Sequence, residues 1–141
     1  MSSEITQTVL VVDAQGGGLG KQLITSMRKN AINAHIIACG TNSTATMAML
    51  KAGADEVATG ENSICVASKR ASIIVGPIGL VITDAMLGEI TPKIALSIAR
   101  SKATRIFIPF SNCDNYIVGV SNYSLGTLIE EAVAKLKELC Q

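Results

Sequence analysis

Four glycines at positions 16, 17, 18 and 20, followed by Lys21, are the residues whose types and spacing best suit chemistry with a phosphate. Glycine has no Cβ, so its backbone can take positive φ and touch a bound group. An apolar run over 8–12 predicts a buried strand before the turn, and apolar residues at helical spacing follow it. The free N–H groups of a helix that begins here favour an anion. We therefore expect a phosphate-bearing ligand over Gln15, Gly16, Gly17, Gly18, Leu19, Gly20 and Lys21.

The glycine spacing limits the identity of that ligand. The dinucleotide pattern G-x-G-x-x-G requires a glycine at position 21, where the chain has Lys21. The turn is closer to the G-x-x-x-G-x-G pattern of short-chain reductases, although one glycine of that pattern is also missing. A magnesium-binding phosphate loop requires Ser or Thr at position 22, where the chain has Gln22. NAD(P) is the leading ligand, followed by another nucleotide. The alternative is that the glycines form only a tight turn.

The elements that position this turn follow a regular pattern along the chain. Short apolar runs alternate with capped helical segments, which is typical of a parallel sheet covered by helices. We predict a single-domain Rossmann-like fold over residues 1–141, an α/β/α sandwich of three layers with a mainly parallel sheet in the strand order 3-2-1-4-5-6. The predicted strands cover residues 8–12, 34–38, 55–58, 72–75, 105–110 and 116–120.

Small polar residues after the second predicted strand extend the candidate site. Dinucleotide folds place an acidic residue on the ribose at this point, and the chain has none there. Thr41, Asn42 and Ser43 take its place in the sequence. These residues either cap the following helix or contact a ribose or phosphate, and both interpretations stay open.

Two further loops complete the predicted binding residues. Thr59 and Gly60 follow the third strand and repeat the theme of small polar residues before a helix. Gly76, Pro77 and Gly79 follow the fourth strand. In an open α/β sheet, the crevice lies where the strand order reverses, between the first and fourth strands. We therefore expect this second glycine turn to face the first.

The amino-acid composition of the chain limits the classes of partner that it can bind. A net charge of +1 and 3% aromatic residues provide neither a basic surface nor stacking platforms, so we expect no nucleic acid partner. Charged residues interrupt every apolar stretch before it reaches membrane-spanning length, so no membrane partner is expected. Hydrophobic residues make up 48% of the chain and charged residues 16%. This balance predicts a homo-oligomer in which a second copy covers apolar surface.

Cysteine and histidine usage predicts no metal site. Cys39, Cys65, Cys113 and Cys140 show no C-x-x-C spacing, and His35 is the single histidine. The polar start MSSEITQTV has no basic segment followed by an apolar one, so it does not resemble a secretory signal. We expect a cytoplasmic protein with free thiols.

Catalytic groups are harder to name. The chain has no Tyr-x-x-x-Lys pair, no Ser/His/Asp set and no cysteine with a histidine nearby in sequence. Asp84, Glu89 and Lys93 are the best chemical candidates, although solvated surface charges explain them more simply. Whether the protein is an enzyme stays open. The alternatives to nucleotide binding are a non-catalytic structural or regulatory Rossmann-like subunit and, resting on Lys21, a phosphate-loop hydrolase.

Five segments carry a resemblance to a known family. They are VVDAQGGGLGKQ, GTNSTATMAMLKAGAD, ATGENS, IIVGPIGLVI and MLGEITPK, and together they span nearly the whole chain in this order. The sequence resembles a family of short bacterial proteins known only as a domain of unknown function. The resemblance implies a Rossmann-like architecture and no established activity.

Overall fold

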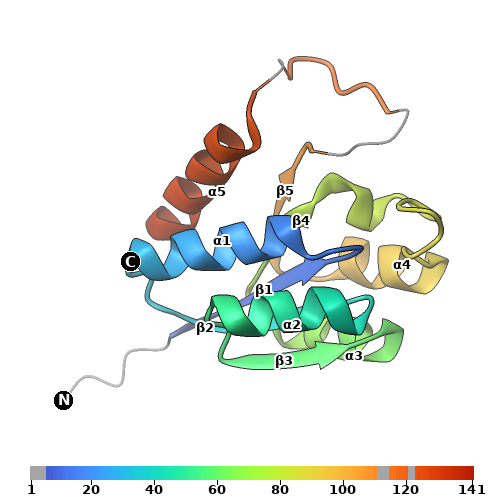
Figure 1. The fold of residues 1–141 in the computed structure, drawn as a ribbon, viewed down its shortest axis with the longest axis horizontal. Helices are drawn as coiled ribbons and strands as arrows, with labels where there is room; N and C mark the ends of the chain where they lie inside the picture. The colour runs from blue at the N-terminus through green and yellow to red at the C-terminus, as the bar shows by residue number, and fades with distance from the viewer. Residues whose placement is uncertain (1–5, 111–114, 121–122) are drawn as a thin grey trace.

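A computed structural model describes residues 6–110, 115–120 and 123–141 of the chain. Five parallel strands form one sheet in the order β3-β2-β1-β4-β5 (Figure 1). The strands are β1 (Gln7–Asp13), β2 (Ala34–Gly40), β3 (Glu56–Thr59), β4 (Ile73–Pro77) and β5 (Thr104–Ile108). The helices are α1 (Gly18–Lys29), α2 (Ser43–Ala52), α3 (Glu61–Arg70), the short 3-10 helix η1 (Ile78–Val81), α4 (Pro92–Arg100) and α5 (Leu125–Leu139).

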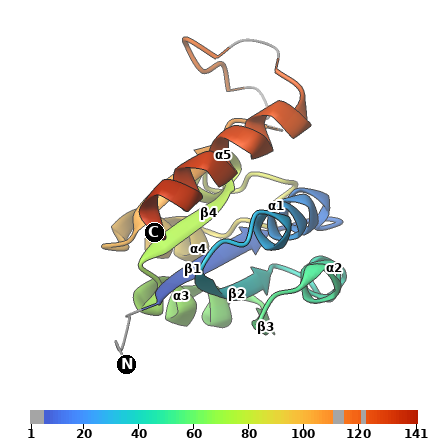
Figure 2. The same ribbon diagram turned by 90° about the vertical axis from the view of Figure 1, so that its left-hand side faces the viewer.

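Helices cover both faces of the sheet. α1, α2 and α5 lie on one face, and α3 and α4 lie on the other (Figure 2). Alternate side chains of β1 supply both cores, because Val9 and Val11 point to the first face while Leu10 and Val12 point to the second. All four are fully buried. The three-layer, Rossmann-like sandwich predicted from the sequence is therefore confirmed.

The strand order reverses beside β1. The chain passes from β1 to β2 and β3 on one side and then returns to place β4 and β5 on the other. β1 pairs with β2 along its whole length and with β4 from Val9 to Val11. The carboxyl ends of β1 and β4 thus flank the crevice in which open α/β sheets bind ligands.

Side-chain caps define three of the helix starts. The Asn42 side chain accepts a hydrogen bond from the Ala45 N–H at 2.9 Å, at the start of α2. Thr91 caps α4, whose first residue is Pro92, and Ser124 caps α5. Both of these caps were expected from the sequence, because a hydroxyl before proline or before an apolar stripe satisfies an otherwise unpaired N–H group.

The predicted sixth strand, residues 116–120, is wrong. Its described residues form a turn, in which the Val120 N–H donates to the Ile117 carbonyl at 3.2 Å and Gly119 has φ of 88°. Tyr116 and Val118 are 86% and 87% exposed, so their apolar pattern buries nothing in this chain. β5 also ends earlier than predicted, at Ile108, because Pro109 has no N–H group to continue the ladder. Residues 111–114 of the intervening loop lie outside the described part of the chain.

The structure also bears on the expectations about membrane spans and free thiols. No helix within the described residues has the length and apolar character that crossing a membrane requires. Cys39, Cys65 and Cys140 are free thiols, and the fourth, Cys113, lies outside the described residues.

Ion pairs and hydrogen bonds link the amino-terminal ends of β2 and β3, at the end of the sheet away from the glycine turn. The Asp55 carboxylate accepts from the Ile36 N–H and pairs with Arg28, both at 2.8 Å. The Nε2 of His35 lies 2.5 Å from the Glu56 carboxylate. The Ile36 N–H, followed by Arg28 and His35, holds the pKa of Asp55 below its usual value, and the hydrogen bond from His35 does the same for Glu56. His35 therefore belongs to a structural network at the edge remote from the glycine turn.

This network predicts a loss of stability in acid. A carboxyl group whose pKa is lowered by folding contributes stability above its unfolded pKa of about 4 and loses that contribution as the pH falls. Asp55→Asn should therefore lower the free energy of unfolding at pH 7, and its difference from the wild type should shrink toward pH 3. Urea unfolding at several pH values measures this difference. A difference that stays constant from pH 7 to pH 3 would show that ionised Asp55 contributes nothing.

Candidate functional site

The glycine turn lies at the carboxyl end of β1, in the crevice beside β4. Ten residues line a cavity of about 170 Å³, which we call the crevice cavity. Seven of them are consecutive residues that run from the end of β1 into α1, and the others come from β4, the segment after η1 and the segment after β5. The lining residues are Asp13, Ala14, Gln15, Gly16, Gly17, Gly18, Leu19, Pro77, Met86 and Phe110. The structure thus brings the first glycine turn and Pro77 of the second together, as expected.

Packing explains two of the four glycines. Gly17 has φ of 75°, and a Cβ added there would lie 2.7 Å from the Cα of Ala45. A Cβ at Gly20 would lie 2.6 Å from the Met49 sulfur and 3.1 Å from the Cβ of Asp13. Only glycine at these positions lets α1 lie this close to α2 and to the end of β1. Their presence says nothing about a ligand.

Packing does not explain Gly16 and Gly18. A Cβ at either residue would have no heavy atom within 4 Å, and neither residue has positive φ. Both are exposed and line the crevice cavity. Among residues 6–110, 115–120 and 123–141, neither amide donates a hydrogen bond to a protein acceptor. These two positions therefore combine an unpaired N–H group with open space above a backbone that any residue could adopt.

The Asp13 side chain binds backbone N–H groups at the start of α1, on the buried side of the turn. Its carboxylate accepts from the Ala14 N–H at 2.8 Å and from the Gly20 N–H at 2.7 Å. Burial raises the pKa of Asp13; the two N–H donors oppose that rise, and the charge of Glu89 adds to it. The sequence interpretation missed this role. The available signal was an acid that closes a buried strand before a helix with no side-chain cap of its own.

The side chain of Glu89 reaches the glycine turn from the segment between η1 and α4. Its Oε1 accepts from the Thr41 hydroxyl at 2.6 Å, the Asn42 amide at 2.9 Å and the Gln15 N–H at 3.0 Å. Burial raises the pKa of Glu89, but these three donors together outweigh burial and leave the pKa below its usual value. Glu89, named from the sequence only as a chemical candidate, thus binds residues of both the β1 and β2 loops.

The loop after β2 therefore has two roles. Asn42 caps α2, as expected, and its side-chain amide also donates to the Gln15 carbonyl at 2.9 Å. Thr41 contacts Glu89 and lies half-buried beside the turn. Ser43 is the exposed first residue of α2. The structure thus places all three predicted residues next to the glycine turn.

Lys21 lies on the other side of the turn from the crevice cavity. It lines a separate hollow of about 470 Å³ between the starts of α1 and α2, which we call the lysine hollow. Its lining residues are Gly16, Lys21, Ser43, Thr44, Met47, Ala48 and Lys51. Gly16 lines both spaces, so a molecule laid across the turn reaches Asp13 on one side and two lysines on the other.

The remaining predicted residues have local structural partners. The Thr59 hydroxyl lies 2.7 Å from that of Thr46, and the Gly60 N–H donates to the Gly40 carbonyl at 2.9 Å. No hydrogen bond within the described residues joins either of them to the glycine turn. In the second glycine turn, Gly76 belongs to β4, where a Cβ would lie 2.6 Å from the Val12 carbonyl oxygen.

Gly79 also serves packing, because a Cβ there would lie 2.9 Å from the terminal methyl carbon of Met86. Of the three residues in the second turn, only Pro77 lines the crevice cavity. Gly76 and Gly79 therefore let neighbouring groups approach the backbone closely, and Met86, which packs against Gly79, lines the crevice cavity.

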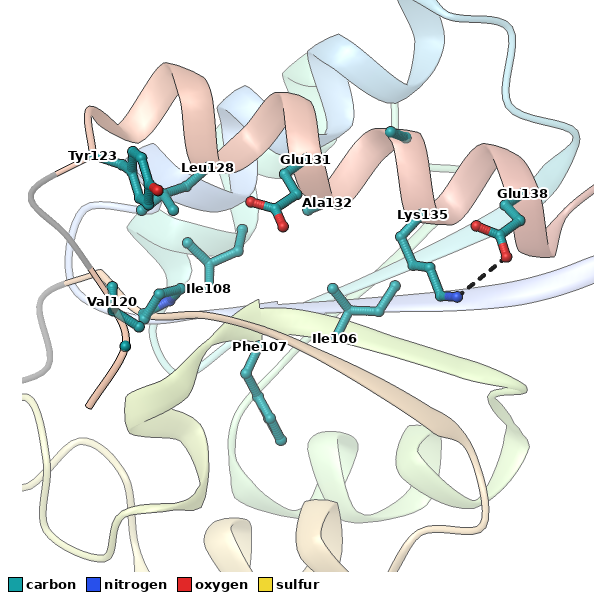
Figure 3. A pocket seen from close by; sticks show the side chains of 13 residues that line it. Ile106, Phe107, Ile108, Val120, Tyr123, Leu128, Glu131, Ala132, Lys135 and Glu138 are labelled. Atoms are coloured by element: carbon teal, nitrogen blue, oxygen red, sulfur yellow. Dashed lines mark hydrogen bonds and ion pairs between the residues drawn. The ribbon is translucent and has the colours of Figure 1, made fainter. Parts of the chain in front are cut away.

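A larger cavity, of about 660 Å³, lies between the edge strand β5 and α5. Figure 3 shows Ile106 and Ile108 pointing from β5 toward α5, while Phe107 points to the opposite face of the sheet. The α5 residues Lys135 and Glu138 form an ion pair at its rim, with 3.3 Å between the charged atoms. The glycine among its lining residues, Gly119, lies in a turn of the loop before α5 and not at the start of a helix. β5 is an edge strand of the sheet, and the homo-oligomer expected from the composition stays a prediction.

The described residues hold no group of three His, Cys, Asp or Glu side chains arranged for a metal ion. Asp84 and Lys93, the other two chemical candidates, are exposed. Among the described residues, neither side chain makes a hydrogen bond or ion pair; the Cys65 thiol donates to the backbone carbonyl of Lys93 at 3.9 Å. The chemistry available around the glycine turn is that of the Asp13 carboxylate, two unpaired amides and the adjoining Thr41–Asn42 loop with Glu89 bound to it.

The parallel sheet, the reversal beside β1 and the glycine turn at that reversal define a Rossmann-like α/β protein. The chain belongs to the family described as a domain of unknown function (DUF3842), whose model matches residues 8–141. This membership confirms the family resemblance seen in the sequence. Comparisons with curated proteins and with solved structures give no match.

The two kinds of glycine in the turn should respond differently to a methyl group. Gly17→Ala forces positive φ on a residue with a Cβ and pushes that Cβ into α2, so it should destabilise the protein by about 2 kcal/mol or more. The matched variant Gly16→Ala meets open space and should change stability by less than about 0.5 kcal/mol. Urea unfolding of both variants measures the contrast, and equal losses would contradict the assignment of Gly17 to packing.

Proposed function

We propose that the protein binds a nucleotide, with NAD(P) the leading ligand, and that a phosphate of this ligand rests on the amides of Gly16 and Gly18. One observation carries the proposal: these two glycines face open space with unpaired N–H groups, and neither packing nor φ requires a glycine there. Glycine is the residue that lets a bound group approach the backbone most closely, so its presence at two positions where neither packing nor φ requires it favours a ligand there.

The surroundings of the turn support a ligand longer than a single phosphate. The crevice cavity and the lysine hollow both include Gly16, so they meet at the turn that follows β1. A dinucleotide has two halves joined by a pyrophosphate, so the pyrophosphate crosses the turn while one half extends toward Pro77 and Phe110. The other half extends toward Thr41 and Ser43. Lys21 and Lys51 supply positive charge on that side.

The alternative function is that of a structural or regulatory subunit without a ligand. The position of Asp13 supports this alternative. Its carboxylate takes the Gly20 and Ala14 amides, and its charge weakens the attraction of the helix start for an anion. In that case the turn is only a joint between β1 and α1. Two features of Gly16 and Gly18, their unpaired amides and their open surroundings, favour nucleotide binding over this alternative.

Replacing Gly18 by valine separates the two functions. The valine side chain enters open space, so the variant should fold, but it covers the place where a phosphate would meet the backbone. We expect isothermal titration calorimetry to show NAD or a related nucleotide binding to the wild type and no detectable binding to Gly18→Val. The matched control is Gly126→Val, which makes the same change in the first turn of α5, where a Cβ has no contact closer than 3.9 Å.

The control should bind as tightly as the wild type. Two results would refute nucleotide binding at the turn. One is a wild type that binds none of NAD, NADP, ADP and ATP, and the other is a folded Gly18→Val variant whose affinity equals that of the wild type.

A further inference from the structure

Glu89 supplies a carboxylate at a place where the local sequence has none. Dinucleotide folds hold the ribose hydroxyls with an acid at the end of the second strand, and here β2 is followed by Gly40, Thr41 and Asn42. The structure brings Glu89 to this loop from the segment before α4, more than 45 residues along the chain. A carboxylate is therefore present at the end of β2 although its residue is distant in sequence.

The three donors to Glu89 all contact one of its two oxygens. Thr41, Asn42 and Gln15 donate to Oε1, and among the described residues Oε2 accepts no hydrogen bond. The carboxylate is thus held in one orientation with an acceptor oxygen left over. Because the three donors stabilise the charged form, Glu89 is ionised at neutral pH. An ionised carboxylate attracts hydroxyl donors and repels a phosphate.

The segment that carries Glu89 is fixed at several points. Its neighbour Ile90 is fully buried, and the Asp84 N–H donates to the Ile90 carbonyl at 2.7 Å. Met86 is buried against Gly79, and it has φ of 58°. Figure 1 shows this segment at the end of the molecule toward which β1 points. The position of Glu89 is therefore set by the fold and does not depend on contacts with the glycine turn alone.

Resting on the proposed function, we infer that Glu89 binds the ribose hydroxyls of the nucleotide and makes the site select NAD over NADP. Oε2 accepts from a free 2′-hydroxyl, whereas the 2′-phosphate of NADP would bring negative charge against the carboxylate. Lys21 and Lys51 line the adjacent lysine hollow and act in the opposite direction, so the preference between the two dinucleotides shows which charge lies nearer the ribose.

Calorimetric titration of the wild type, Glu89→Gln and Asp84→Asn with NAD and NADP tests this inference. The wild type should bind NAD at least about tenfold more tightly than NADP. Glutamine keeps an oxygen for the three donors but places an uncharged amide where Oε2 was, so Glu89→Gln should reduce that ratio about tenfold or more. The control, Asp84→Asn, removes one charge from the same segment, at an exposed residue that makes no hydrogen bond to the site. This variant should keep the wild-type ratio of NAD to NADP affinity.

Different results would contradict the role of Glu89 and the proposed nucleotide binding. If Glu89→Gln weakens both dinucleotides by the same factor, Glu89 only ties its segment to the glycine turn and the inference is overturned while nucleotide binding stands. A wild type that prefers NADP overturns it without any variant, so the test survives if Glu89→Gln does not fold. A wild type that binds no nucleotide at all removes the proposed function, and this inference with it.

Discussion

The hydrogen bonds of the Asp13 carboxylate are the constraint on which the site depends. By accepting from the Ala14 and Gly20 amides, Asp13 fixes how β1 enters α1 and covers the inner side of the helix start. It also determines which amides remain. Gly17 donates to Ala14 and Gly20 to Asp13, so Gly16 and Gly18 are left facing the crevice. The same carboxylate places negative charge beneath the turn, and any anion bound above it must be held by hydrogen bonds as much as by the helix dipole.

Charge is distributed unevenly around the turn, and this distribution would orient a bound ligand. Asp13 lines the crevice cavity, Glu89 lies at the Thr41–Asn42 loop and its charge raises the pKa of Asp13, whereas Lys21 and Lys51 line the lysine hollow. A ligand with separate phosphate and sugar groups suits this arrangement better than a compact polyanion does. The absence of Ser or Thr at position 22 agrees with this distribution, because no residue there would hold a magnesium ion for hydrolysis.

The parts of the structure that were predictable are those set by local pattern. The buried run in β1, the glycine turn and the capping residues Thr91 and Ser124 act within a few residues, so their outcome follows from the sequence. The sixth strand failed because apolar alternation at Tyr116 and Val118 does not make a strand unless another strand is there to pair with it.

The long-range part of the site was not predictable in the same way. The segment before Glu89, which meets Thr41, takes positive φ at Asp84, Met86 and Leu87. Aspartate adopts positive φ more often than most residues, but nothing in the residue types of Met86 and Leu87 indicates that conformation. Likewise, the sequence shows four similar glycines, and only the packing of α2 against Gly17 and Gly20 separates those the fold requires from those it does not.

The central claim is that the Gly16 and Gly18 amides bind a phosphate, and NMR observes those amides directly. In ¹H–¹⁵N spectra of the labelled protein titrated with NAD, the Gly16 and Gly18 signals should shift progressively and saturate. The Gly126 signal, from the first turn of α5, should stay in place. Saturating shifts confined to the cavity between β5 and α5, or no shift of Gly16 and Gly18 at saturating NAD, would contradict phosphate binding at the glycine turn.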